Sequence, residues 1–240
     1  MNRIIIYLVL ALLCMQCCTQ KNSQELKTEK GLIAMKDSLP QYPKEKQYSY
    51  IVHMNTKTPY ELYLDDILIE WQTESGFSES IELNPYLLRN GAHRLKIRFL
   101  PRESAKENLV HPQDIIYDKD TKWNIYFIEL KKDASDALGY SQPIDYAKAE
   151  LEIVAPPTDI PVWEQEWDIE VKNLPYDLRG WRDGEDLLKL DQEELKKEVV
   201  TFYNHLRNLL HEGKIIEFME LNKRLDFETG ISMYNTPEVY

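Results

Sequence analysis

The sequence predicts a mainly β protein with a helical C-terminal segment, in which an antiparallel β-sandwich is followed by a helix pair (α+β). Two observations carry this prediction. Short runs of alternating polar and apolar residues, separated by turn residues, recur between residues 47 and 173 with no regular helix between them. Beyond residue 190, apolar residues recur instead at the spacing of about 3.6 residues that amphipathic helices show.

Residues 1–17 have the pattern of a secretory signal peptide. A short basic start with Arg3 leads into an apolar run from Ile4 to Leu13, which is too short to span a bilayer. The three cysteines of the chain, Cys14, Cys17 and Cys18, follow at once. This segment resembles a bacterial lipoprotein signal, in which the lipidated cysteine becomes the first residue of the mature protein.

Cys18 is the expected lipidation site. Cleavage in such signals needs a small residue before the lipidated cysteine, and Cys17 is small, whereas the bulky Leu13 and Gln16 precede the other two cysteines. The resemblance therefore implies a membrane anchor of acyl chains such as palmitate, which is durable when more than one chain is attached. An ordinary cleaved signal peptide is the alternative. A mature chain that begins at Cys18 keeps no free thiol pair for a disulfide.

Residues 18–46 are expected to form a flexible tether, because they are rich in Lys, Gln, Glu and Ser, contain Pro40 and Pro43, and show no sustained periodicity. Lipoproteins sent to the outside of some bacterial outer membranes carry an acidic cluster after the cysteine, and residues 19–23 contain no acidic residue. The resemblance thus implies a protein of the bacterial cell envelope that is anchored in the outer membrane and faces the periplasm.

The composition predicts a folded body with an acidic surface. A chain of 240 residues with 43% hydrophobic residues can bury a substantial core. Its formal net charge of −12 repels phosphate backbones, so we expect no nucleic-acid partner.

The strand pattern fills the β-sandwich domain expected at residues 47–173. The clearest strand places Leu95, Ile97 and Phe99 on one face, and Asp65-Asp66 predicts a tight turn between two other strands. The predicted strands are Tyr48 to Met54, Glu61 to Leu64, Ile67 to Gln72, Arg94 to Leu100, Lys122 to Lys131, Ala147 to Val154 and Trp167 to Val171.

One helical turn is predicted just before the clearest strand. Asn84 would cap it, Pro85 suits its first position, and Gly91 can take the positive φ that ends it. With the turn at Asp65-Asp66, the stretch from Tyr60 to Pro101 resembles jelly-roll-like β-sandwich modules of carbohydrate-active and other exported bacterial proteins. The resemblance implies the fold and carries over no functional residue.

Residues 174–240 are predicted to be helical, with a domain boundary in the loop from Leu174 to Gly184. Asp191 and Glu194 have capping-box spacing, Gly213 ends the first helix, and a second helix runs from Lys214 to Leu225. The apolar stripe of the first helix must pack on the sandwich, on the second helix or on a partner. We expect the sandwich, with Phe202 buried. The stripe consists of Leu195, Val199, Phe202, Leu206 and Leu209.

The helix pair also resembles the opening of a cystatin-like fold of the nuclear-transport-factor type, in which helices precede a curved sheet. The chain stops at Tyr240, before such a sheet could form. We therefore favour an accidental likeness, and the alternative is that the chain is a fragment of a cystatin-like fold protein.

No catalytic pattern is present in the sequence. It contains no His-Glu-x-x-His pattern, no Gly-rich phosphate loop and no Gly-x-Ser-x-Gly elbow, and the five histidines are scattered. We therefore expect no catalytic residue, no metal site and no cofactor, and a protein that is not an enzyme.

Four carboxylates recur at alternate positions, at Glu164, Glu166, Asp168 and Glu170, and should form a row on one face of a strand. One hypothesis is a docking strip for a cationic partner. The alternative is an exposed strand face that a basic row on a neighbouring strand neutralises. We expect the two rows to pair within one sheet. The basic row consists of Arg94, Lys96 and Arg98.

Trp181 lies between Arg179 and Arg182 in a predicted loop. An aromatic side chain next to arginine is typical of hot spots in recognition sites, so this loop is a candidate binding site for a protein or a sugar. The alternative is that Trp181 fills the junction between two domains.

These features predict a lipid-anchored exported binding protein without catalytic activity. Its unknown protein partner would be a component of an envelope complex or a toxin that it neutralises. The alternative is a glycan-binding accessory lipoprotein in which tryptophans such as Trp71 or Trp181 stack on sugar rings. An exposed row of aromatic side chains would favour the sugar, and an exposed apolar or acidic patch without such a row would favour the protein.

Overall fold

The computed structural model describes residues 30–31, 33–56, 59–73, 77–100, 124–132, 145–154 and 163–237. The signal peptide and Cys18 lie outside these residues. The described chain forms two compact units. One unit is rich in strands and consists of Gln41–Leu178 together with Ser232–Tyr234. The other is helical and includes Arg179–Ile231.

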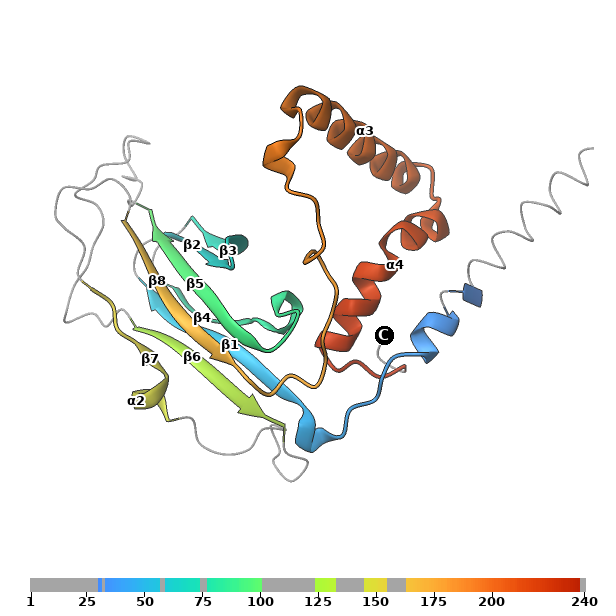
Figure 1. Cartoon of the computed structure of the whole chain (residues 1–240). Coiled ribbons are helices and arrows are strands. Elements are labelled where there is room, and N and C mark those ends of the chain that lie inside the picture. The colour runs from blue at the N-terminus through green and yellow to red at the C-terminus, as the bar shows by residue number, and fades with distance from the viewer. Residues whose placement is uncertain are drawn as a thin grey trace, which may run out of the picture. The chain divides into compact units, whose positions relative to one another are not determined.

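The strand-rich unit is a β-sandwich of two antiparallel sheets with four strands each (Figure 1). The first, sheet A, has the order β4 (Phe77–Glu82), β1 (Tyr48–Thr56), β6 (Asn124–Lys131) and β7 (Glu150–Leu151). The second, sheet B, has the order β3 (Ile67–Gln72), β2 (Tyr60–Leu64), β5 (Gly91–Phe99) and β8 (Trp163–Val171). The predicted mainly β fold with a helical C-terminal segment is confirmed.

Alternate residues of the strands supply the core. Leu95, Ile97 and Phe99 of β5 are fully buried, as their spacing predicts, and Tyr50 and Val52 of β1 are buried in the same way. Burial of one large apolar side chain contributes about 1.5 to 3 kcal/mol, so these rows dominate the stability of the sandwich.

The predicted turn between β2 and β3 is confirmed. Asp65 and Asp66 have φ values of 49° and 65°, the left-handed conformation that a two-residue type I′ hairpin turn requires at both positions. Gly91, at the start of β5, has a φ of 135°, which a residue with a side chain rarely adopts.

Asn84 does not cap a helix, contrary to the prediction. A short 3₁₀ helix occupies Asn84–Tyr86 and begins after Leu83, which has no capping side chain. The amide of Asn84 instead binds the backbone of β1: its Oδ1 accepts from Tyr50 N at 2.9 Å and its Nδ2 donates to Tyr48 O at 2.9 Å. The side chain binds β1 because β4 ends at Glu82, so the backbone groups of Tyr48 and Tyr50 need other hydrogen-bond partners.

One strand prediction was wrong, and one strand was missed. Residues 147–154 were expected to form one strand, but the structure has the helical turn α2 (Tyr146–Ala149) and then the two-residue strand β7. Strand β4 was not predicted, because its register places Glu79 in an inward position opposite Met54. The hydroxyl of Tyr60 donates to the Glu79 carboxylate. This hydrogen bond allows a charged residue at an inward position where the alternation predicts an apolar one.

The end of the expected tether is ordered. Residues 33–37 are helical, Lys44–Lys46 form a 3₁₀ helix, and the sandwich unit already begins at Gln41. The ring of Tyr42 packs edge-on against that of Tyr234, with 6.0 Å between the centroids. An aromatic anchor in an otherwise polar segment is the reason that this part of 18–46 is not a free linker. The sandwich unit likewise extends to Leu178, beyond the expected end at residue 173.

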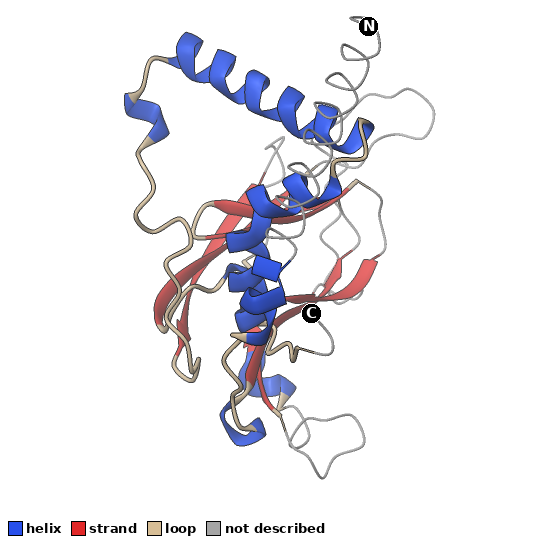
Figure 2. Cartoon of the chain, turned by 90° about the vertical axis from the view of Figure 1, so that its right-hand side faces the viewer, coloured by secondary structure: helices blue, strands red, loops and turns tan. Residues whose placement is uncertain are grey.

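The helical unit contains α3 (Gln192–His211) and α4 (Ile215–Ser232), drawn as the long blue helices in Figure 2. The predicted cap is confirmed, because the side chain of Asp191 accepts from Glu194 N at 2.9 Å. Gly213 has a φ of 68° and separates the helices. The second helix continues past the predicted end at Leu225 to Ser232.

Candidate functional site

The acidic and basic rows lie on neighbouring strands of sheet B, as predicted. Strands β5 and β8 pair in the register Arg94 opposite Asp168, Lys96 opposite Glu166 and Arg98 opposite Glu164. In both strands the alternate residues point into the core, so the charged residues share the outer face of the sheet.

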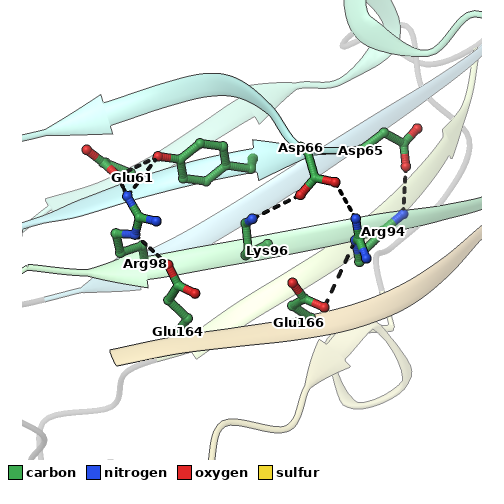
Figure 3. A network of polar contacts seen from close by, with 9 residues as sticks. Glu61, Asp65, Asp66, Arg94, Lys96, Arg98, Glu164 and Glu166 are labelled. Carbon is green, nitrogen blue, oxygen red and sulfur yellow. Dashed lines mark hydrogen bonds and ion pairs between the residues drawn. The ribbon is translucent and has the colours of Figure 1, made fainter. Parts of the chain in front are cut away.

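Figure 3 shows how these charges meet. Arg98 Nε lies 2.5 Å from the Glu164 carboxylate, and Arg98 also reaches Glu61 of β2 at 3.0 Å. Lys96 Nζ lies 3.0 Å from Asp66, which also pairs with Arg94. The network therefore extends over the β2–β3 turn and three strands.

The network shifts the pKa of two of its charged groups, Asp66 and Arg98, in the direction that favours the charged form. Lys96 and Arg94 lower the pKa of the Asp66 carboxyl, with the hydrogen bond from Lys96 as the largest cause. The hydrogen bond to Glu164 raises the pKa of the Arg98 guanidinium. Lys96 and Arg98 also lie over the ring of Tyr63, at 4.9 and 5.6 Å from its centroid.

This pairing weakens the docking-strip hypothesis. Glu164 is neutralised by Arg98, and Glu166 lies at the outer limit of an ion pair, 4.0 Å from Arg94. Among the described residues, Asp168 and Glu170 form no ion pair. Only at this end of the row is the negative charge not neutralised by an ion pair.

The loop around Trp181 is hydrogen-bonded to α4. Gly180 N donates to Glu228 at 2.9 Å, and Gly180 O accepts from Arg224 at 2.9 Å. Arg179 pairs with Asp183 at 2.8 Å, so its guanidinium is occupied within the loop.

The side chain of Trp181 is 46% exposed. Trp71 is exposed on β3 of the sandwich, whereas Trp181 belongs to the helical unit. The two tryptophans therefore do not form one aromatic row within either unit.

Most of the apolar stripe of α3 is exposed or half-buried, which corrects the expectation for Phe202. Its side chain is 51% exposed, and only Leu209 of the stripe is buried. Helices α3 and α4 leave the Gly213 turn at an angle and do not pack along each other (Figure 1). Helical spacing identified an apolar face correctly, but spacing alone carries no information about what covers that face.

One group of side chains was missed by the sequence analysis. Ser80, His53, Tyr126 and Glu150 stand opposite one another on β4, β1, β6 and β7, and form one row across the outer face of sheet A. Their sequence positions are far apart, and only the strand pairing brings them together. Tyr146 of α2 packs on two members of the row.

Comparisons with known proteins return no match: no family model matches the sequence, and no curated protein or solved structure is significantly similar to it. In the described ranges, no group of three or more His, Cys, Asp or Glu is placed to hold a metal ion. No helix in the described part of the chain is long and apolar enough to cross a membrane. The fold alone thus defines the class: a mainly β, α+β protein with a sandwich and a helical C-terminal region.

Proposed function

We propose that this chain is an exported, lipid-anchored binding protein that captures a protein partner with its C-terminal helices. The observation that carries the proposal is the exposure of large apolar side chains on α3 and α4. Phe202 is 51%, Tyr203 67% and Leu225 63% exposed. Contiguous exposed apolar surface is costly in water and marks interaction sites in stable proteins.

The arrangement of these side chains suits a groove-binding or helix-binding partner. Val199, Phe202 and Tyr203 are three and four residues apart on α3, so they share one side of the helix. Phe202 and Tyr203 contact each other edge-on, with 6.4 Å between ring centroids. Aromatic residues of this kind are typical anchors of protein interfaces. A component of the cell envelope or a toxin that the protein neutralises fits such a surface.

The lipid anchor is the second part of the proposal, and the pattern of residues 1–18 supports it. Acyl groups on Cys18 would hold the protein at the outer membrane, facing the periplasm. Mass spectrometry of the mature N-terminus tests this directly, and Cys18→Ser should move the protein from the membrane to the soluble fraction. An unmodified N-terminus, or acyl groups on Cys14, would contradict the assignment.

Affinity capture tests the helical surface. The full chain is used to isolate partners from envelope extracts, and the affinity of each identified partner is then measured for the wild type and for Phe202→Ala/Tyr203→Ala. Loss of two aromatic anchors should weaken binding about a hundredfold or more, since an interface hot spot contributes 2 kcal/mol or more.

Trp71→Ala is the matched control, because it removes an exposed aromatic residue from the sandwich and leaves the helices intact. A partner whose affinity is unchanged in the helix variant, or reduced equally in the control, would refute the helical surface as the binding site.

A further inference from the structure

The row on the outer face of sheet A combines aromatic rings with hydrogen-bonding groups. Val52 and Met54 are buried, so the intervening His53 points away from the core. Its Nδ1 lies 2.9 Å from Ser80 Oγ on β4, and its ring stacks on that of Tyr126 on β6, with centroids 6.0 Å apart and planes 26° apart. Glu150 continues the row on β7, opposite Tyr126.

Tyr146 completes the group from outside the sheet. Its ring meets Tyr126 edge-on at 5.1 Å and His53 at 6.5 Å, with interplanar angles of 79° and 65°. Figure 1 shows α2, which carries Tyr146, beside β6 and β7. Although it contacts two rings, Tyr146 remains 47% exposed, so a large part of its surface is open to a ligand.

Polar groups surround the rings. Asn124 Nδ2 donates to Glu150 Oε1 at 3.0 Å. The second carboxylate oxygen of Glu150 and the amide oxygen of Asn124 are further hydrogen-bond acceptors. Ser80 offers a hydroxyl, and the Nε2 of His53 lies at the end of the ring opposite the nitrogen that meets Ser80. Donors and acceptors therefore lie beside flat apolar surfaces on one side of one sheet.

We propose that this face of sheet A, defined by Ser80, His53, Tyr126, Glu150 and Tyr146, binds a neutral saccharide. A sugar ring presents C–H groups on its faces, which pack on aromatic rings, and hydroxyls around its rim, which pair with carboxylate, imidazole and amide groups. An apolar peptide would bury the second carboxylate oxygen of Glu150 and the Nε2 of His53 and would offer them no partner, which is costly. A phosphate-bearing ligand would be repelled by the Glu150 carboxylate and by the net charge of −12 of the chain.

This site consists of residues of the sandwich unit, whereas the surface that we propose for a protein partner consists of residues of the helical unit. The two proposals can therefore fail independently.

Affinity electrophoresis of the full chain through gels that contain β-glucan, xylan, galactan or soluble chitin oligosaccharides tests the site. We expect retardation by at least one of these neutral polysaccharides, followed by a dissociation constant from calorimetry with the corresponding oligosaccharide. Tyr146→Ala should weaken that affinity about three- to tenfold, the effect of removing one aromatic contact.

Two further variants distinguish a binding role from a structural one. Glu150→Gln keeps every ring and removes only the carboxylate charge, so reduced affinity in a variant with unchanged thermal unfolding indicates direct contact with sugar hydroxyls. Trp71→Ala, on the outer face of the other sheet, should bind as the wild type does. No retardation by any of the polysaccharides, or binding that Tyr146→Ala and Glu150→Gln leave unchanged, would overturn the proposal.

Discussion

Asn84 and Tyr234 extend the hydrogen bonding of β1 beyond the end of β4. The side chain of Asn84 accepts from Tyr50 N and donates to Tyr48 O. The Tyr234 hydroxyl accepts from Tyr48 N at 3.1 Å and donates to Tyr48 O at 2.8 Å. Asn84 Nδ2 also donates to Ser232 O at 3.1 Å. Two side chains thus act as a substitute strand, which explains a fully buried asparagine in a mainly apolar environment.

Asn84→Ala should lower the free energy of unfolding by about 2 to 4 kcal/mol, because it leaves buried backbone groups of β1 without partners. Urea unfolding measures the change. Asn90→Ala is the control: its amide makes two hydrogen bonds, both to the backbone of Leu174, but the residue is exposed. A loss no larger than that of the control would contradict the role of Asn84 as a substitute strand.

Glu82 is a titrating group with a predictable effect on stability. Burial raises the pKa of its carboxyl, opposed by the Ser49 hydrogen bond and the charge of Lys132. The Oε1 atom has no hydrogen-bond partner in the described structure. Because the folded state binds this proton more tightly than the unfolded chain, stability falls as the pH rises from the ordinary carboxyl pKa through the raised one.

Glu82→Gln removes this titration. The free energy of unfolding of the variant, relative to the wild type, should therefore increase from pH 4 to neutral pH, as measured by urea unfolding at several pH values. Glu217→Gln, on the exposed side of α4, controls for the loss of one charge. A difference that does not change with pH would show that the Glu82 carboxyl ionises equally in both states.

At the scale of single elements, the sequence predicted most of the strands of the sandwich. Strand β3 matches its prediction residue for residue, and the core face of β5 is as expected. Strand β4 was missed because Glu79 interrupts its apolar positions. The pairing of β5 with β8 was predictable from their charges. Each strand carries charges of one sign at every second residue, and two rows of opposite sign can pair only if the strands are neighbours in one sheet.

The candidate sites were less predictable than the strands. Helical spacing shows that α3 has an apolar face, but the covering of that face depends on tertiary contacts that no local pattern encodes. The row from Ser80 to Glu150 depends on the order and register of four strands that lie far apart in sequence. No local signal identifies such a row.

Phe202→Ala gives the test at this scale. A buried phenylalanine would cost about 3 to 5 kcal/mol on truncation, whereas a half-exposed one on a helix with few contacts to the other described helices should cost under about 1 kcal/mol. Urea unfolding of the full chain measures the difference. Leu209→Ala is the matched variant, because Leu209 is the buried residue of the same stripe and should cost clearly more. Equal losses for the two variants would mean that the whole stripe is buried in solution.

At the scale of the whole molecule, the helical segment leaves the sandwich and returns to it at one place. The sandwich unit ends at Leu178 and resumes with Ser232–Tyr234. Asn84 holds both ends, because it accepts from the Tyr176 hydroxyl at 3.4 Å through its carbonyl and donates to Ser232 O at 3.1 Å. The rings of Tyr176 and Tyr234 lie 6.1 Å apart. The segment Arg179–Ile231 is therefore built like an insertion whose ends are fixed by the sandwich.

Excision of Arg179–Ile231 should consequently leave a folded sandwich. The variant joins Leu178 to Ser232 through a Gly-Ser linker of about six residues. We expect it to unfold cooperatively, with a free energy of unfolding within about 1 kcal/mol of that of the sandwich in the full chain. The reason is that the excision removes no core residue of the two sheets. Circular dichroism should show loss of helix and retention of strand signal. A second variant that also lacks Ser232–Tyr234 should be less stable, since Tyr48 loses both contacts to the Tyr234 hydroxyl. If the first variant fails to fold, the helices contribute to the sandwich core, and their apolar faces are then surfaces of that core and not sites for a partner.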